Sequence, residues 1–233
     1  MVTTLFLIRH GATEGSETRS YKGSIDVPLS GKGIEQVRRT AAFLDSYVRT
    51  AVPEQRKSYL RDIHASGGDA VPADEAPALT AVYCSDLSRS KKSAEIVAAP
   101  HGLGAIEMKE LRERSFGRWE GMSFLEIRER FPEEFGNWSR DPLFYSPPGG
   151  ESTLAVRDRV MKGLEQILAM HQGECFAIVA HGGVNRIILC EVLGMPLDNI
   201  FRIEQDHAAL NVIEFWDRHP VVRQMNYLPG GGC

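Results

Sequence analysis

The chain has 233 residues, of which 42% are apolar and 25% charged, and its formal net charge is −4. These values are typical of one large globular domain, and the acidic balance argues against a nucleic-acid or membrane-surface partner. No apolar stretch approaches the roughly 20 residues that span a bilayer, and the four cysteines show no C-x-x-C spacing, so we expect a cytoplasmic protein with reduced thiols.

Short strand patterns alternate with helical patterns along the chain. In chain order the sequence predicts a strand at 3–9, a helix at 30–48, a strand at 81–84, a helix at 88–98, a strand at 105–108, short helices within 122–140 broken by Pro132 and Gly136, a helix at 151–170, a strand at 175–180, a helix at 184–194, and an antiparallel hairpin of strands at 209–216 and 220–228. This alternation predicts an α/β protein in three layers, with helices on both faces of a mostly parallel central sheet.

One segment interrupts the regular pattern. Residues 50–79 hold three prolines and a Gly-Gly pair with little periodicity, where about 3 to 6 residues would normally connect a helix to a strand. We interpret them as a surface segment inserted into a single domain that spans residues 1–228, followed by a flexible tail at 229–233. A lid or an oligomer contact is the alternative interpretation of the insertion.

Two predicted strands run directly into His-Gly pairs. Arg9, His10 and Gly11 end the first strand, and His181 and Gly182 follow the strand at 175–180. In a parallel α/β sheet, ligands bind outside the carboxyl ends of the strands. A single histidine after a strand is usually structural, but two in equivalent places favour a shared pocket.

The residues near these histidines favour a phosphate group as the ligand. Arginine presents a fixed fork of donors that suits phosphate, and Arg9 precedes His10. Gly182 and Gly183 open a helix whose N-terminal N–H groups attract anions, and Arg89 stands in the first turn of the helix at 88–98. The sequence has no P-loop, dinucleotide fingerprint or metal-ligand spacing, so we expect no cofactor and no metal, with the arginines supplying the positive charge.

Four blocks of the sequence resemble those of the histidine phosphatase superfamily, whose members have the phosphoglycerate mutase-like fold. In chain order they are LIRHGATEGSETRSYKGSIDVPLSGKG at 7–33, VYCSDLSRSKKSAEI at 82–96, LRERSFGRWEG at 111–121 and IVAHGG at 178–183. The resemblance therefore implies a phosphoglycerate mutase-like α/β/α domain.

The resemblance also implies a catalytic set, namely His10, Arg9, Arg89, Glu113 and His181. In it, His10 is the nucleophile that forms a phosphohistidine, while the arginines and the second histidine hold the phosphate oxygens. Glu113 is the general acid and base, preferred to Glu110 because it matches the motif.

The loop after the first strand is expected to bind the substrate. The substrate-binding candidates are Ser16, Lys22, Gly23 and Gly182. Family members usually carry Glu or Gln where this chain has Ala12 and Asn where it has Ser16, and many carry Arg where it has Ser20. These differences do not affect the predicted nucleophile or the phosphate-binding arginines. We therefore expect them to influence which substrate the protein binds.

The segment at 121–152 favours a phosphatase over a mutase. It has no lysine and no Arg-Arg pair, which mutases of this family carry for the substrate's distal groups, and it resembles the cofactor-independent phosphatase branch, including the broad-specificity and alpha-ribazole phosphatases. We expect a small phosphorylated metabolite as substrate. A cofactor-dependent phosphoglycerate mutase and a phospho-ligand binding protein without turnover are the alternatives.

Two further expectations concern surfaces. Trp138, Phe144 and Tyr145 are expected either to line an apolar pocket over the site or to pack in the core.

A homodimer is an open alternative to a monomer, with the C-terminal hairpin and the segment at 50–79 as candidate contacts.

Overall fold

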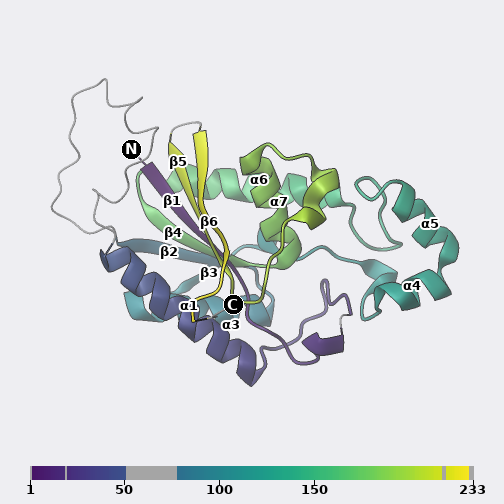
Figure 1. Ribbon diagram of the computed structural model, residues 1–233, viewed down its shortest axis with the longest axis horizontal. Coiled ribbons are helices and arrows are strands. Elements are labelled where there is room, and N and C mark those ends of the chain that lie inside the picture. Colours follow the sequence, from purple (N-terminus) through teal and green to yellow (C-terminus); the bar gives the residue numbers. More distant parts are fainter. Residues whose placement is uncertain (1, 19, 51–77, 217–218, 231–233) are drawn as a thin grey trace.

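A six-stranded sheet with the strand order β3-β2-β4-β1-β5-β6 forms the centre of the fold in a computed structural model that describes residues 2–18, 20–50, 78–216 and 219–230 (Figure 1). The strands are β1 (Val2–Arg9), β2 (Leu79–Cys84), β3 (Ala105–Glu107), β4 (Cys175–Ala180), β5 (Leu210–Trp216) and β6 (His219–Tyr227). The four strands β1, β2, β3 and β4 run parallel to one another, while β5 is antiparallel to both β1 and β6. The mostly parallel sheet and the C-terminal hairpin are confirmed.

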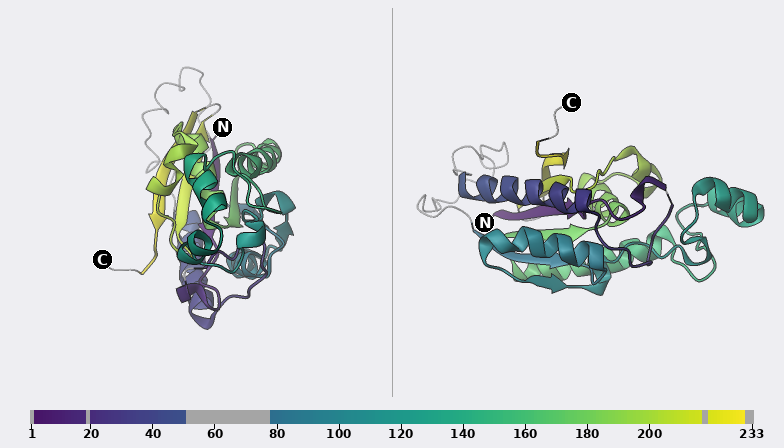
Figure 2. Two further views of the ribbon diagram at one scale, coloured as in Figure 1. Left: turned by 90° about the vertical axis from the view of Figure 1, so that its right-hand side faces the viewer. Right: turned by 90° about the horizontal axis from the view of Figure 1, so that it is seen from below.

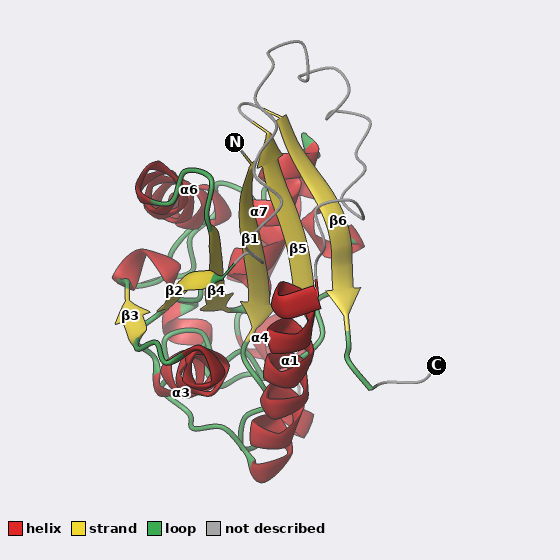
Figure 3. Cartoon of the chain, turned by 90° about the vertical axis from the view of Figure 1, so that its left-hand side faces the viewer, coloured by secondary structure: helices red, strands yellow, loops and turns green. Residues whose placement is uncertain are grey.

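Helices cover both faces of this sheet (Figure 3). The long helices are α1 (Gly31–Thr50), α3 (Ser88–Ala98), α6 (Thr153–Met170) and α7 (Gly182–Leu193). Successive residues of β1 point to opposite faces, so Leu5 and Leu7 pack in a core with α6 and α7, while Phe6 and Ile8 pack in a second core with α1 and α3. All four side chains are fully buried, which explains why β1 is apolar at every one of these positions.

Short 3-10 turns connect these elements. They are η1 (Ser16–Thr18), η3 (Ala99–His101), η4 (Lys109–Leu111), η5 (Gly117–Trp119) and η6 (Leu197–Arg202). At the start of α1 the Ser30 hydroxyl accepts a hydrogen bond from the Gly33 N–H at 3.1 Å, the cap that the sequence predicts.

The loop after β1 lies directly on the start of α1. A Cβ atom at Gly11 would lie 2.3 Å from the carbonyl oxygen of Gly33, and one at Gly33 would lie 1.9 Å from the carbonyl oxygen of Ala12. The two segments can approach this closely only because both Gly11 and Gly33 lack a side chain. The contact fixes the backbone that carries His10.

Two further helices, α4 (Phe124–Arg130) and α5 (Pro132–Arg140), project beyond one end of the sheet (Figures 1 and 2). A capping box formed by Ser123 and Glu126 starts α4, and Pro132 separates the two helices, as the sequence predicts. The predicted break at Gly136 is wrong, because Gly136 lies inside α5. Nothing lies within 4 Å of a Cβ atom placed there, and glycine costs an exposed helix only about 1 kcal/mol.

Several expectations fall on segments that are not described. Residues 51–77 and 231–233, and with them most of the proposed insertion and tail, lie outside the described residues, so the domain boundaries and the homodimer stay predictions. Cys84, Cys175 and Cys190 are buried. Within the described ranges, no helix combines the length and the apolar character needed to cross a bilayer.

The contact between Gly33 and Ala12 predicts a position-specific cost. Gly33→Ala should lower the free energy of unfolding by about 1–3 kcal/mol, because the new methyl group overpacks against backbone, and chemical denaturation measures this change. Gly31→Ala is the matched control: it lies in the same helical turn, with nothing within 4 Å of its Cβ position. Equal stabilities for the two variants would contradict the prediction.

Candidate active site

The carboxyl ends of three neighbouring strands, β2, β4 and β1, bring the predicted site residues together. They border a cavity of about 370 Å3. Every predicted site residue except His181 lines this cavity, namely Arg9, His10, Ser16, Lys22, Gly23, Arg89, Glu113 and Gly182. His181 is fully buried behind His10, and the centroids of the two imidazole rings are 5.1 Å apart.

His10 is held as a neutral imidazole with one free lone pair. Its Nδ1 atom lies 2.7 Å from the carbonyl oxygen of Gly11, and because a carbonyl can only accept, Nδ1 carries the proton and Nε2 the lone pair. Burial, followed by the nearby His181 and Arg9, holds the pKa of His10 well below its usual value. The ring is therefore prepared to attack an electrophilic phosphorus atom through Nε2.

His181 also keeps one nitrogen available. Its Nε2 atom lies 2.7 Å from the hydroxyl of Ser85, at the end of β2, while Nδ1 is buried and has no partner among the described residues. Burial, Arg89 and Arg9 hold the pKa of His181 well below its usual value. Nδ1 is thus the nitrogen of His181 that the protein leaves without a hydrogen-bond partner among the described residues. The predicted block at 82–96 contains Ser85, but its contact with His181 became visible only in the fold.

Arg89 is buried between the start of α3 and the turn at residues 23–25. Its guanidinium donates hydrogen bonds of 2.7 Å to the carbonyl oxygens of Gly23 and Ile25, and burial lowers its pKa. Gly23 has a positive φ of 49°, and a Cβ atom there would lie 2.5 Å from Glu120 Oε1. Gly23 therefore shapes the turn that holds Arg89, in addition to lining the cavity.

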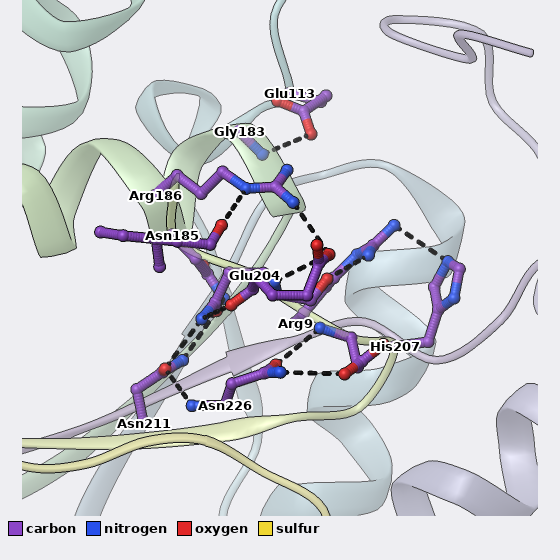
Figure 4. A network of polar contacts seen from close by, with 12 residues as sticks. Arg9, Glu113, Gly183, Asn185, Arg186, Glu204, His207, Asn211 and Asn226 are labelled. Carbon is purple, nitrogen blue, oxygen red and sulfur yellow. Dashed lines mark hydrogen bonds and ion pairs between the residues drawn. The ribbon is translucent and has the colours of Figure 1, made fainter. Parts of the chain in front are cut away.

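Arg9 has a partner that the sequence did not reveal. One terminal nitrogen donates to the carbonyl oxygen of Gln205 and the other lies 3.0 Å from Nε2 of His207, while Nε is buried with no partner among the described residues (Figure 4). Since a guanidinium only donates, His207 Nε2 accepts and the imidazole is neutral. Burial and Arg9 lower the pKa of His207 to about 4. His207 lies in a loop without any motif, so no sequence signal marks it.

A buried amide network holds the loop that carries His207. Gln205 Nε2 donates to Asn211 Oδ1 at 3.0 Å, and Asn211 Nδ2 donates to the carbonyl oxygen of Leu7 in β1 at 3.0 Å. The Asn226 N–H of β6 donates to the same Asn211 oxygen at 2.8 Å (Figure 4). The antiparallel strands β5 and β6 thus fix the orientation of the Arg9 side chain.

Glu113 sits at the N-terminus of α7. Its carboxylate accepts a hydrogen bond of 3.0 Å from the N–H group of Gly183 (Figure 4) and another of 3.0 Å from the N–H group of Arg114. A Cβ atom at Gly183 would lie 2.4 Å from Glu113 Oε1, so a glycine is required for this approach. Glu110, the alternative acid, instead packs its Cβ atom near Gly163 of α6 and does not line the cavity.

The aromatic residues of the segment after Glu113 divide into two groups. Trp138 lines the cavity, whereas Phe144 is 68% exposed and Tyr145 stacks on Trp119 with ring centroids 5.8 Å apart. Neither of the latter two lines the cavity, so the pocket-lining expectation is wrong for Phe144 and Tyr145. Other rings that the sequence did not single out line it instead, namely Tyr21, Phe116, Trp119, Phe124, Phe135 and Phe201. Within the part of the chain that the structure describes, no three His, Cys, Asp or Glu side chains gather as metal ligands.

Comparison with known proteins gives the family. The family model of the histidine phosphatase superfamily (branch 1) matches residues 5–54 and 73–228. A bifunctional protein of Mycobacterium tuberculosis is 31% identical over 225 residues, which are 96% of this chain and 54% of that protein, so the chain spans about half the length of this relative. A metal-independent phosphoserine phosphatase of Arabidopsis thaliana is 31% identical over 196 residues, 82% of this chain and 69% of that protein. The crystal structure of the alpha-ribazole phosphatase from Shigella flexneri has a TM-score of 0.77 at 24% identity, covering 98% of each chain.

The support that His207 gives to Arg9 predicts a defect in anion binding. His207→Leu removes the acceptor for a charged donor, so we expect the affinity for inorganic phosphate to fall by about tenfold or more in isothermal titration calorimetry. His207→Gln offers a side-chain oxygen in place of Nε2 and should keep most of the affinity. Equal phosphate affinities for the wild type and the leucine variant would show that Arg9 needs no such support.

The three neutral histidines predict acid sensitivity. In the unfolded chain a histidine binds a proton near pH 6.5, but the folded protein holds the pKa of His10, His181 and His207 below that value. The free energy of unfolding should therefore be highest above about pH 6.5 and fall toward pH 4, by about 1.4 kcal/mol per pH unit for each histidine. Urea denaturation between pH 7 and pH 4.5 measures how steeply the free energy of unfolding falls with pH. His207→Gln should reduce this slope by the contribution of one histidine, about 1.4 kcal/mol per pH unit. An unchanged slope in that variant would refute the assignment.

Proposed function

The chain belongs to branch 1 of the histidine phosphatase superfamily, and we propose that it is a phosphatase that hydrolyses small phosphate monoesters through a phosphohistidine on His10. The observation that carries the proposal is the neutral His10 imidazole, whose Nδ1 is bound to the Gly11 carbonyl and whose Nε2 lone pair is free beside the buried Arg89 and the partly buried Arg9. This is the arrangement that a nitrogen nucleophile for a phosphate dianion requires.

In the first step, the substrate phosphate is held by the Nε–H of Arg9, the guanidinium of Arg89 and Nδ1 of His181. His10 Nε2 attacks phosphorus in line with the leaving oxygen, forming a P–N bond as the P–O bond breaks. Glu113 donates a proton to the leaving alcohol oxygen. The positive charges of the arginines stabilise the charge on the phosphoryl oxygens, and so we propose that no metal is required.

In the second step, a water molecule replaces the alcohol. Glu113, now a carboxylate, accepts a proton from the water as its oxygen attacks phosphorus and the P–N bond breaks. Inorganic phosphate leaves, and His10 regains its lone pair. The names of relatives that act on phosphoserine and alpha-ribazole phosphate support a small phosphorylated metabolite as substrate.

Hydrolysis of p-nitrophenyl phosphate in the presence of a chelator tests the proposal. We expect turnover without added metal, and His10→Ala should lower kcat by more than about a thousandfold because it removes the nucleophile. Labelled phosphate should be recovered on the wild-type protein after an alkaline quench, since phosphohistidine is stable in base. Retained activity in the His10→Ala variant would disprove the assignment of the nucleophile.

Glu113→Gln separates the two steps. The p-nitrophenolate ion leaves without a proton, so this variant should still form the phosphoenzyme but hydrolyse it about 10²–10⁴-fold more slowly, giving a burst followed by slow turnover. Transfer of the phosphoryl group to a phosphoglycerate in preference to water would instead identify a mutase. Phosphate binding without any turnover would identify a binding protein.

A further inference from the structure

Beyond the phosphate end, the cavity is walled by aromatic rings. This aromatic wall consists of Tyr21, Phe116, Trp119, Phe124, Phe135 and Trp138. It is built by the loop after β1, the turn η5 and the projecting helices α4 and α5. It lies outside both cores of the sheet, so a role in supporting the central fold does not account for it.

The rings of the aromatic wall hold one another in place. Phe124 lies 5.0 Å from Phe135 and 5.2 Å from Trp138, both edge to face, and Tyr21 lies 4.6 Å from Phe116. Edge-to-face and tilted pairs at these separations stabilise each other. Phe124 nevertheless keeps 41% of its surface exposed. The wall is therefore pre-formed and leaves apolar surface for a ligand to cover.

Two arginines beside the wall, Arg114 and Arg186, are already engaged by the protein, whereas Lys22 lines the cavity near the loop after β1. Each of the three nitrogens of Arg114 donates to an internal oxygen, on Glu151, Thr153 and Tyr145, at 2.8–3.1 Å. Arg186 donates to the carbonyl oxygen of Ile203 at 2.7 Å and to the Glu204 carboxylate at 3.1 Å. Neither arginine is therefore positioned chiefly to bind a carboxylate on the alcohol part of a compact polar substrate.

On these observations, and resting on the phosphatase function proposed above, we propose that the alcohol part of the substrate carries a planar apolar group, such as an aryl ring, that packs against the aromatic wall. The phosphate then lies on Arg9, Arg89 and His10. The cavity of about 370 Å3 falls within the range of pockets that enclose a whole small organic ligand. A compact zwitterion such as phosphoserine would leave the wall uncovered.

A pair of esters with the same kind of leaving oxygen tests this substrate class. Ethyl phosphate and 2-phenylethyl phosphate both release a primary alcohol, so their intrinsic reactivities are similar, and only the second carries a ring. We expect kcat/KM for 2-phenylethyl phosphate to exceed that for ethyl phosphate, and also that for phosphoserine, by about tenfold or more, because a buried ring contributes to transition-state binding.

Variants locate the effect on the wall. Trp138→Ala should lower kcat/KM for 2-phenylethyl phosphate by about tenfold while leaving that for ethyl phosphate within about threefold. Phe124→Thr, at an already half-exposed position, provides a second variant, and the rate on ethyl phosphate reports whether each variant is folded. Phe144→Ala is the matched control, because Phe144 is 68% exposed and lies outside the cavity; it should change neither rate.

The possible failures are distinguishable. Equal kcat/KM values for the two simple esters, or a preference for phosphoserine, would overturn the aryl substrate class and leave the phosphatase function standing. The same discrimination in the Trp138→Ala and Phe124→Thr variants as in the wild type would also overturn it. Hydrolysis of none of the esters would overturn the phosphatase function itself, and the substrate class with it.

Discussion

The buried positive charge of Arg9 and Arg89 is the constraint on which the rest of the site depends. Burial lowers the pKa of both guanidinium groups, and a buried charge is costly unless it is hydrogen-bonded. Within the described residues neither arginine makes an ion pair. Carbonyl oxygens of Gln205, Gly23 and Ile25 accept their hydrogen bonds instead. Glu113 acts on both guanidinium groups only from a distance, so their positive charge is available to a phosphate dianion.

This positive charge, together with burial, explains the state of the histidines around it. A third cation beside the arginines would be repelled, and burial disfavours the imidazolium as well, so the pKa values of His10, His181 and His207 are all lowered. Neutral rings can then accept as well as donate. His207 accepts from Arg9, and His10 keeps a lone pair because the Gly11 carbonyl fixes its tautomer.

The fold separates the phosphate end of the cavity from the substrate end. The ends of β1, β2 and β4, with the close approach of Gly11 to Gly33, hold the charged groups in a rigid frame. Helices α4 and α5, which project beyond the sheet (Figure 2), provide half of the aromatic wall, namely Phe124, Phe135 and Trp138. Chemistry and substrate preference therefore lie on different elements, and the wall can change without disturbing the nucleophile.

The sequence by itself determined the order of strands and helices, the His-Gly pairs after two strands and the four blocks that carry the family resemblance. These are local patterns, in which hydrophobic period and neighbouring residues hold the information. Only the tertiary structure joined His207 to Arg9, Ser85 to His181 and Gly183 to Glu113, because those contacts arise from the strand order and from loops without a motif. It also excluded Phe144 and Tyr145, which follow α5 outside any helix, from the pocket and kept Gly136 inside α5, because both outcomes depend on how the segment after Glu113 packs and not on local sequence.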